Sequence, residues 1–223
     1  MGPVAAAELS LIAYGDVVAG CTKCALAEGR TQVVFGSGSP AAELMFVGEA
    51  PGFHEDKQGV PFVGAAGKLL DKLLGGIGFS RADVYVCNTV KCRPPGNRNP
   101  LPEELEACEG HLFRQIELIQ PKLVATLGNF ATKLLSGKPA GITQVHGREQ
   151  RVVLGGQSVT LYPIFHPAAA LYTPRMLAVL EADFARIPEL LGRAPTPAPA
   201  VAPVAAVVLE PAPEAEQQQL GLF

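Results

Sequence analysis

The chain has 223 residues, of which 48% are hydrophobic, and this length suits one α/β domain with a sizeable core. Its net charge of −3 argues against a strongly basic nucleic-acid-coating protein, although a local basic patch remains compatible with DNA binding. No apolar run is long enough to span a bilayer, no secretory signal is expected, and five unevenly spaced cysteines argue against a disulfide scaffold.

Short apolar runs alternate with helical patterns along the first 191 residues. The patterns predict strands at 44–48, 84–88, 123–127 and 158–165, the last entered through a hairpin from 152–154. They predict helices at 66–77, 102–119 and 174–191, and a short helix ending at Leu135. This alternation indicates a mainly parallel sheet with helices on both faces. Ligands bind such sheets outside the carboxyl ends of the strands, where Gly48, Glu49, Asn88 and His166 are expected.

The composition changes sharply after Gly192. Residues 194–217 consist mostly of Ala, Pro and Val, and repeated prolines exclude a regular helix or a central strand. We therefore expect a folded domain over 1–193, an extended and disordered linker over 194–217, and a separate short peptide over 218–223.

Four cysteines have a spacing that suggests a metal site. Cys21 and Cys24 form a CxxC pair, while Cys92 and Cys108 flank a proline-rich loop that needs an anchor at each end. Four thiolates suit either a tetrahedral zinc ion or a four-iron cluster, and the spacing does not distinguish them. The alternative is that some of these are ordinary buried core cysteines, which is how we interpret Cys87.

Several motifs, in order, resemble those of the family 4 uracil-DNA glycosylases, which are iron–sulfur enzymes of the uracil-DNA glycosylase superfamily. The resemblance extends from about Cys21 to Leu191. The motifs are Gly48-Glu49-Ala50-Pro51-Gly52, Pro61-Phe62-Val63-Gly64, Asn88, Lys91-Cys92-Arg93-Pro94-Pro95 and His166-Pro167-Ala168-Ala169. The resemblance implies a four-stranded parallel α/β/α sandwich and a [4Fe–4S] cluster on Cys21, Cys24, Cys92 and Cys108. It also implies DNA repair by base excision without strand cleavage.

The resemblance further implies a uracil pocket. The target nucleotide must leave the base stack, because an enzyme cannot reach a base inside a duplex. Phe62 matches the residue that stacks on uracil, and Asn88 matches the residue whose amide binds its edge. A neutral His166 would donate a hydrogen bond to uracil O2 as negative charge develops there. The first motif contributes Gly48 with its backbone amides and Glu49, whose carboxylate would orient water or stabilise the sugar cation. Glu55 is a candidate to exclude the methyl group of thymine.

The surroundings of these motifs suggest how DNA is held. In the superfamily the loop after His166 enters the minor groove, so Leu171 or Tyr172 is the predicted wedge and Arg175 a phosphate contact. Leu171 has an alternative interpretation as a core residue. Lys91, Arg93 and Arg98, next to the proposed cluster, are further predicted phosphate contacts.

Residues 219–223, Gln-Leu-Gly-Leu-Phe, resemble the peptide with which bacterial proteins bind the sliding clamp. Gln219 would be a polar anchor, and Leu220, Leu222 and Phe223 would fill a hydrophobic groove. The alternative is a frayed terminus. We expect a monomeric, nucleoid-associated bacterial protein of the cytoplasm.

Two other functions remain open on the sequence. One is a non-catalytic nucleic-acid-binding module with a structural zinc ion, and the other is a superfamily glycosylase with different or broader base specificity. Relatives that crosslink to abasic DNA carry a Gln in the first motif and an inserted basic loop. The first motif here has Glu49, and the stretch around His146 is short, which disfavours a crosslinking protein.

Overall fold

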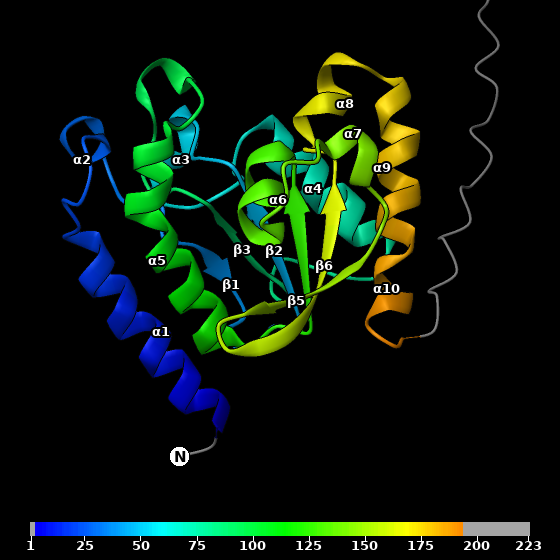
Figure 1. Cartoon of the computed structure of the whole chain (residues 1–223), viewed down its shortest axis with the longest axis horizontal. Helices are drawn as coiled ribbons and strands as arrows, with labels where there is room; N and C mark the ends of the chain where they lie inside the picture. The colour runs from blue at the N-terminus through cyan, green and yellow to red at the C-terminus, as the bar shows by residue number, and fades with distance from the viewer. Residues whose placement is uncertain (1–2, 194–223) are drawn as a thin grey trace, which may run out of the picture.

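The computed structural model describes residues 3–193, so the predicted linker at 194–217 and the peptide at 218–223 lie outside the described part. Within it a single sheet is covered by helices on both faces (Figure 1). The strands are β1 (Ser37–Gly38), β2 (Leu44–Gly48), β3 (Tyr85–Asn88), β4 (Leu123–Leu127), β5 (Gln150–Leu154) and β6 (Gln157–Ile164). None of the described helices combines the length and the apolar character needed to cross a bilayer.

The sheet has the order β1-β3-β2-β4-β6-β5. The four central strands β3, β2, β4 and β6 run parallel, whereas β1 and β5 pair antiparallel at the two edges. The expectation of four strands is therefore wrong, because six are present, although the parallel part is four-stranded. The hairpin prediction is confirmed by β5 and β6. The strand β1 has two residues, too few to give a sequence pattern.

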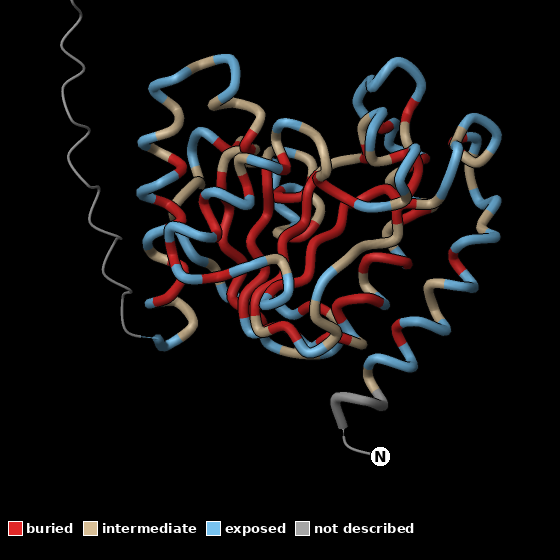
Figure 2. The backbone as a smooth tube through the Cα atoms, turned by 180° about the vertical axis from the view of Figure 1, so that it is seen from behind, coloured by how far each residue is buried: buried red, intermediate tan, exposed pale blue. Residues whose placement is uncertain are grey.

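The central strands form because their apolar runs can be buried from both sides. Every residue of β2, β3 and β4 is buried, as expected for parallel strands between two helical layers (Figure 2). Alternate side chains enter two separate clusters. One cluster packs against α4 (Ala65–Gly76) and α9 (Arg175–Ala185), and the other against α5 (Pro102–Ile119) and α6 (Asn129–Ser136).

The longest of the helices that the sequence did not predict lies at the start of the described part. This is α1 (Pro3–Ala19), which packs against α5. The predicted helix at 174–191 is divided into α9 and α10 (Ile187–Leu190), because Pro188 lacks the N–H that a continuous helix would need. The other short elements are α2 (Leu26–Gly29), α3 (Phe53–Gln58), η1 (Pro95–Asn97), α7 (Ile142–Val145) and α8 (Ala168–Tyr172).

Candidate active site

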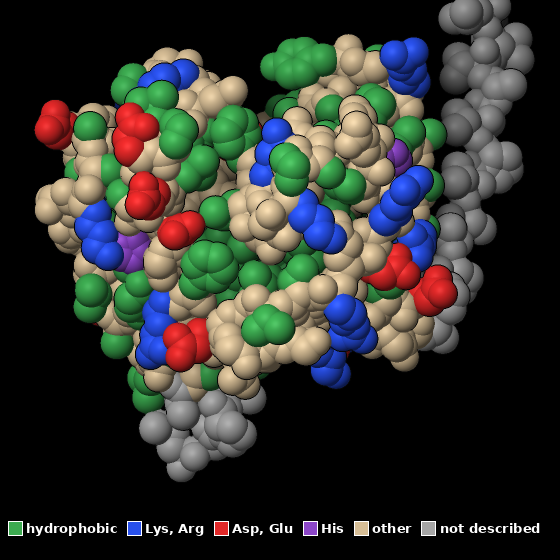
Figure 3. Space-filling model, viewed as in Figure 1, with side chains coloured by type: hydrophobic (Ala, Val, Ile, Leu, Met, Phe, Trp, Pro, Cys, Tyr) green, Lys and Arg blue, Asp and Glu red, His purple; other side chains and the backbone are tan. Residues whose placement is uncertain are grey.

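A cavity of about 430 Å³ opens at the carboxyl ends of the parallel strands. Figure 3 shows the surface hollowed between the loop that precedes α5 and the lobe that carries α8. Its volume lies in the range of small-ligand sites. The predicted residues that line it are Glu49, Glu55, Phe62, Asn88, Arg98, His166 and Tyr172. The fold therefore brings together side chains that are up to 123 positions apart in the chain.

Asn88 presents an unused hydrogen-bond acceptor. It is the last residue of β3 and is 2% exposed. Its Oδ1 is the one buried side-chain oxygen or nitrogen of the described residues that has no hydrogen-bond partner. A buried acceptor of this kind costs about 1–3 kcal/mol unless a ligand supplies the donor. Asn88 can therefore accept a hydrogen bond from an N–H group of a ligand in the cavity.

Gly48 gives Asn88 the space it occupies. Gly48 ends β2 directly beside Asn88 in the parallel register. A Cβ atom on Gly48 would lie 2.5 Å from Oδ1 of Asn88 and 2.6 Å from Cζ of Phe62. A residue without a side chain is thus required where the amide and the aromatic ring converge.

Phe62 and His166 form a stacked pair at the cavity. Their ring centroids are 5.6 Å apart and their planes are inclined by 27°. Nδ1 of His166 accepts a hydrogen bond from the backbone N–H of Ala168 at 3.2 Å, which assigns the ring proton to Nε2. Burial lowers the pKa of His166 to about 4, against a smaller opposing effect of the Glu55 carboxylate. His166 is therefore a neutral hydrogen-bond donor at neutral pH.

The two acidic residues of the cavity differ in their contacts. Burial raises the pKa of Glu49, and its carboxylate makes no hydrogen bond or ion pair with a described residue. In contrast, Oε1 of Glu55 accepts hydrogen bonds from the backbone N–H groups of Val63 (3.0 Å) and Gly64 (2.9 Å). Glu49 is thus free to contact a ligand or water, whereas one oxygen of Glu55 organises the loop that carries Phe62.

A second, smaller cavity is lined by all four predicted metal-binding cysteines, namely Cys21, Cys24, Cys92 and Cys108. Sγ of Cys108 accepts a hydrogen bond from the backbone N–H of Lys91 (3.3 Å), and Sγ of Cys92 accepts one from Arg30 (3.4 Å). Burial raises the pKa of Cys92, and it raises the pKa of Cys108 to about 11. Cys87 is fully buried in the core, as predicted.

A histidine also reaches this cysteine cavity. Nε2 of His111 lies 3.3 Å from Sγ of Cys21, and Nδ1 of His111 lies 2.7 Å from the hydroxyl of Tyr14 on α1. If the Tyr14 hydroxyl donates, the proton of His111 is on Nε2 and points at the sulfur. Among residues 3–193, no three His, Cys, Asp or Glu side chains are arranged to hold a single metal ion.

Comparison with known proteins gives the family of this fold. Residues 35–187 match the model of the uracil-DNA glycosylase superfamily. The chain belongs to this superfamily. It is 47% identical over 186 residues to the type-4 uracil-DNA glycosylase of Sulfurisphaera tokodaii, covering 81% of this chain and 84% of that relative. It is 46% identical to the type-4 enzyme of Archaeoglobus fulgidus (78% and 89% covered) and 49% identical to that of Thermotoga maritima (68% and 78% covered).

Lys91, which the sequence predicted to contact DNA, is buried inside the protein. Lys91 is 1% exposed, and its Nζ donates hydrogen bonds to the carbonyl oxygen of Asn88 (2.8 Å) and to Oε1 of Gln115 (2.5 Å). A buried ammonium cannot reach a phosphate, so the prediction for Lys91 is wrong. Its hydrogen bond to the backbone of Asn88 instead stabilises the end of β3.

Of the other predicted DNA contacts, Arg98 and Tyr172 line the cavity. Leu171 is 45% exposed and Tyr172 is 86% exposed, so Leu171 is not a core residue. Arg175 is exposed, and Arg93 lies over the ring of exposed Phe53, 5.1 Å from its centroid. Arg98 is also exposed, but both of its terminal nitrogens donate to the buried Glu104, at 2.8 and 2.6 Å.

Sequence reasoning missed two residues close to the site. Phe53 begins α3 and supports the guanidinium of Arg93, and the only local signal was Lys57, which follows four positions later and lies over the same ring. Arg81 donates a hydrogen bond to the carbonyl oxygen of Phe62 at 2.8 Å. A single arginine in a turn gives no pattern from which this contact could have been predicted.

Proposed function

We propose that this chain removes uracil from DNA by hydrolysing its N-glycosidic bond and leaves an abasic site for base excision repair. The observation that carries the proposal is the partnerless Oδ1 of Asn88 inside a cavity that also holds Phe62 and a neutral His166. Oδ1 would accept the N3–H of uracil, and the Nδ2 group would donate to O4. The similarity to type-4 uracil-DNA glycosylases supports the same activity.

The residues suggest how the bond is broken. The departing uracil takes the electron pair of the glycosidic bond, and negative charge develops on O2. Nε2–H of His166 donates a hydrogen bond to that oxygen, and the bond strengthens as the charge grows. The carboxylate of Glu49 orients the water that adds to the sugar cation, and the released proton passes to solvent or to uracil. No nucleophilic side chain is needed, so the DNA strand stays intact.

The test of this function is excision from a labelled oligonucleotide that contains one uracil, followed by alkali to cut at abasic sites. We expect alkali-dependent cutting by the wild type and at least about a hundredfold less by Asn88→Ala, because a site built for a hydrogen bond discriminates strongly. Asn129→Ala is a control outside the cavity. No cutting by the wild type would instead indicate a non-catalytic binding module or a different damaged base.

Glu55 has a role that is separate from the bond cleavage. We propose that its free oxygen, Oε2, borders the position of uracil C5 and excludes the methyl group of thymine. The lining position of Glu55 supports this. Glu55→Gln keeps an acceptor for Val63 and Gly64, whereas Glu55→Ala removes it, so only the Ala variant should accept 5-substituted uracils more readily. Unchanged discrimination against thymine in both variants would contradict the proposal.

The four cysteines fit a thiolate-bound [4Fe–4S] cluster. All four line one cavity, the backbone N–H of Lys91 and the guanidinium of Arg30 donate to two of the sulfurs, and Nε2 of His111 lies within hydrogen-bond distance of a third. When bound, the cluster would supply a rigid anchor for the loop between Cys92 and Cys108. A reducing cytoplasm would keep these thiols available.

Visible absorption and iron analysis test the cluster. We expect the purified protein to be brown, and Cys108→Ala to lose both colour and iron. Cys87→Ala is the matched control, because Cys87 is buried outside the cysteine cavity. A colourless wild type that contains zinc would refute the cluster.

We further propose that Arg93, Arg98 and Arg175 contact phosphates while Leu171 or Tyr172 fills the gap left by the flipped base. Arg98 and Tyr172 line the cavity, Leu171 and Arg175 are exposed, and Arg93 is partly exposed, which supports this proposal. Arg93→Gln should lower the slope of affinity against salt by about one released ion, since each phosphate contact releases counterions. If the salt dependence of DNA affinity were unchanged, Arg93 would not be a phosphate contact.

Residues 218–223 lie outside the described part, and their proposed role rests on the sequence. We propose that they bind the bacterial sliding clamp, with residues 194–217 as the tether that raises the effective concentration of the peptide. Deletion of residues 218–223 should abolish binding to the purified clamp and leave excision from short oligonucleotides unchanged. Clamp binding that survives the deletion would refute the role.

A further inference from the structure

Phe62 has an unusual backbone conformation. Its φ is +56°, in the left-handed region that bulky residues avoid. Two other non-glycine residues in the described part share this sign, Asn97 in a 3₁₀ turn and Gln120 at the C-cap of α5, where such angles are ordinary. Phe62 is buried and lies at a functional cavity. Strain of this kind persists only where neighbouring groups enforce it.

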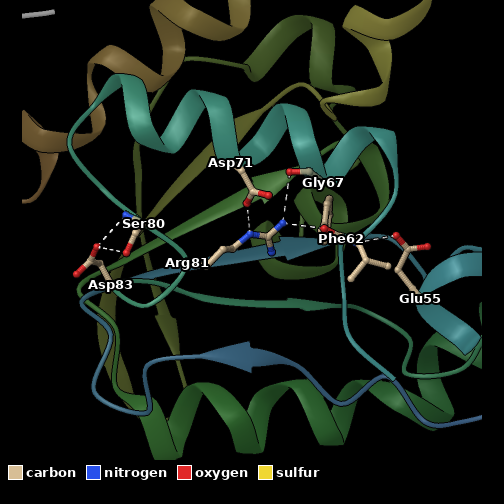
Figure 4. A network of polar contacts seen from close by, with 8 residues as sticks. Glu55, Phe62, Gly67, Asp71, Ser80, Arg81 and Asp83 are labelled. Atoms are coloured by element: carbon tan, nitrogen blue, oxygen red, sulfur yellow. Dashed lines mark hydrogen bonds and ion pairs between the residues drawn. The ribbon is translucent and has the colours of Figure 1, made fainter. Parts of the chain in front are cut away.

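Arg81 is the main neighbour on one side of Phe62. Nη2 of Arg81 donates to the carbonyl oxygen of Phe62 (2.8 Å) and to that of Gly67 (3.4 Å), while Nε is ion-paired with Asp71 (Figure 4). A Cβ atom on Gly67 would overlap the carbonyl oxygen of Phe62, so only glycine leaves space for this oxygen. The carbonyl of Phe62 is therefore held by a charged donor in a space shaped for it.

The rest of the loop is held from elsewhere. Glu55 accepts hydrogen bonds from the N–H groups of Val63 and Gly64, and it approaches the loop from the opposite side to Arg81 in Figure 4. Asp83 accepts from the N–H (2.8 Å) and the hydroxyl (2.6 Å) of Ser80 and so fixes the turn that carries Arg81. The peptide group between Phe62 and Val63 is thus held at its carbonyl oxygen by Arg81 and at its N–H by Glu55, which also holds the next N–H, that of Gly64.

We propose that Arg81 is a positioning residue for uracil excision, which holds the ring of Phe62 in the strained conformation that stacks on the flipped base. Relaxation of φ to negative values would change the direction in which the ring leaves the main chain, and with it the stacking against His166. The interaction with the carbonyl oxygen prevents this, and Asp71 keeps the guanidinium in place. The proposal rests on the stacking role proposed for Phe62.

The experiment is a double-mutant cycle between Arg81 and Phe62. Stacking on an aromatic ring contributes about 1–3 kcal/mol per base, so complete loss of the ring's position would lower kcat/KM between about 5-fold and 150-fold. We expect Arg81→Met to lower kcat/KM for a uracil oligonucleotide by about 10-fold within that range. Inhibition by free uracil should weaken by a similar factor, because that readout needs the ring and not DNA. Arg81→Lys keeps a cationic donor and should therefore retain part of both kcat/KM and the inhibition by free uracil.

The cycle distinguishes positioning from a general structural role. In a Phe62→Ala background, Arg81→Met should change kcat/KM by less than about twofold, since no ring remains to be positioned. An equal loss in both backgrounds would overturn the proposal. Full activity of Phe62→Ala alone would instead refute the stacking role, which is a distinguishable failure.

Control variants address folding. Arg114→Met removes an exposed ion pair with Glu117 outside the cavity and should leave both readouts unchanged. If Arg81→Met does not fold, Asp71→Asn frees the guanidinium of Arg81 without removing it and should give a smaller loss of the same kind. Normal kcat/KM and normal uracil inhibition in a folded Asp71→Asn protein would overturn the proposal.

Discussion

Gly48→Ala is the substitution that most directly tests the geometry of the cavity. The new Cβ would lie 2.5 Å from Oδ1 of Asn88 and 2.6 Å from Cζ of Phe62, about 0.9 and 0.8 Å inside an ordinary contact of 3.4 Å. Both neighbours are side chains, and Gly48 has no positive φ, so the main chain can accept alanine. The fold should therefore survive while the two groups that we propose to bind uracil are displaced.

The expected effect on catalysis is large. A displacement of about 1 Å in a positioning group can cost about 100-fold in rate, so we expect kcat/KM for uracil excision to fall by about that factor. Single-turnover excision from a uracil oligonucleotide measures the rate, and thermal unfolding checks the fold. Gly110→Ala is the matched control, because its Cβ on α5 meets no atom within 4 Å. It should keep full activity and stabilise the protein by about 0.5–1 kcal/mol.

The outcome that would refute this reasoning is a folded Gly48→Ala protein with excision within about threefold of wild type. Asn88 and Phe62 would then not act in the positions described here, and the pocket for uracil would have to be sought in another arrangement of the same loops.

Three further predictions concern other parts of the site. The folded pKa of His166 is about 4 against 6.5 when exposed, so the unfolded chain takes up a proton first and stability falls as the pH drops from 6.5 to 4. In urea unfolding, the free energy of unfolding should fall between pH 6.5 and 4 in the wild type, and it should fall by about 3 kcal/mol less in His166→Asn. Lys91→Met leaves two buried acceptors without a donor and should lower the free energy of unfolding by about 2–6 kcal/mol, whereas exposed Lys133→Met should not change it. Tyr172→Ala should leave stability within about 0.5 kcal/mol, and excision from duplex should fall more than excision from single strands if Tyr172 is the wedge.

The parallel sheet and the cavity residues were predictable because two independent signals agree. Strands buried on both faces appear in the sequence as continuous apolar runs such as Leu44–Val47, and polar residues that interrupt an apolar run at its end lie at one edge of the sheet. The motif positions Gly48, Asn88 and His166 follow from that rule alone. Their roles came from the resemblance to a known family.

Other features depended on contacts that no local pattern contains. Lys91 looks like a surface lysine in the sequence, and its burial depends on Gln115, which is 24 positions away. Arg81 reaches Phe62 only because the turn at Ser80 returns the chain beneath α4. Helix α1 buries only a few side chains, such as Leu11 and Val18, so its apolar face is weakly marked. Tertiary contacts, rather than local preferences, decide these features.

The ring of Phe62 is part of the main hydrophobic cluster that joins the central sheet to α4 and α9. The group that we propose to stack on the base is therefore also part of the core that holds the molecule folded. Adaptation to a hotter or colder habitat usually proceeds through many small changes in such clusters. In this protein those changes would also alter how readily the pocket accepts a base, so temperature adaptation and substrate selectivity would evolve together.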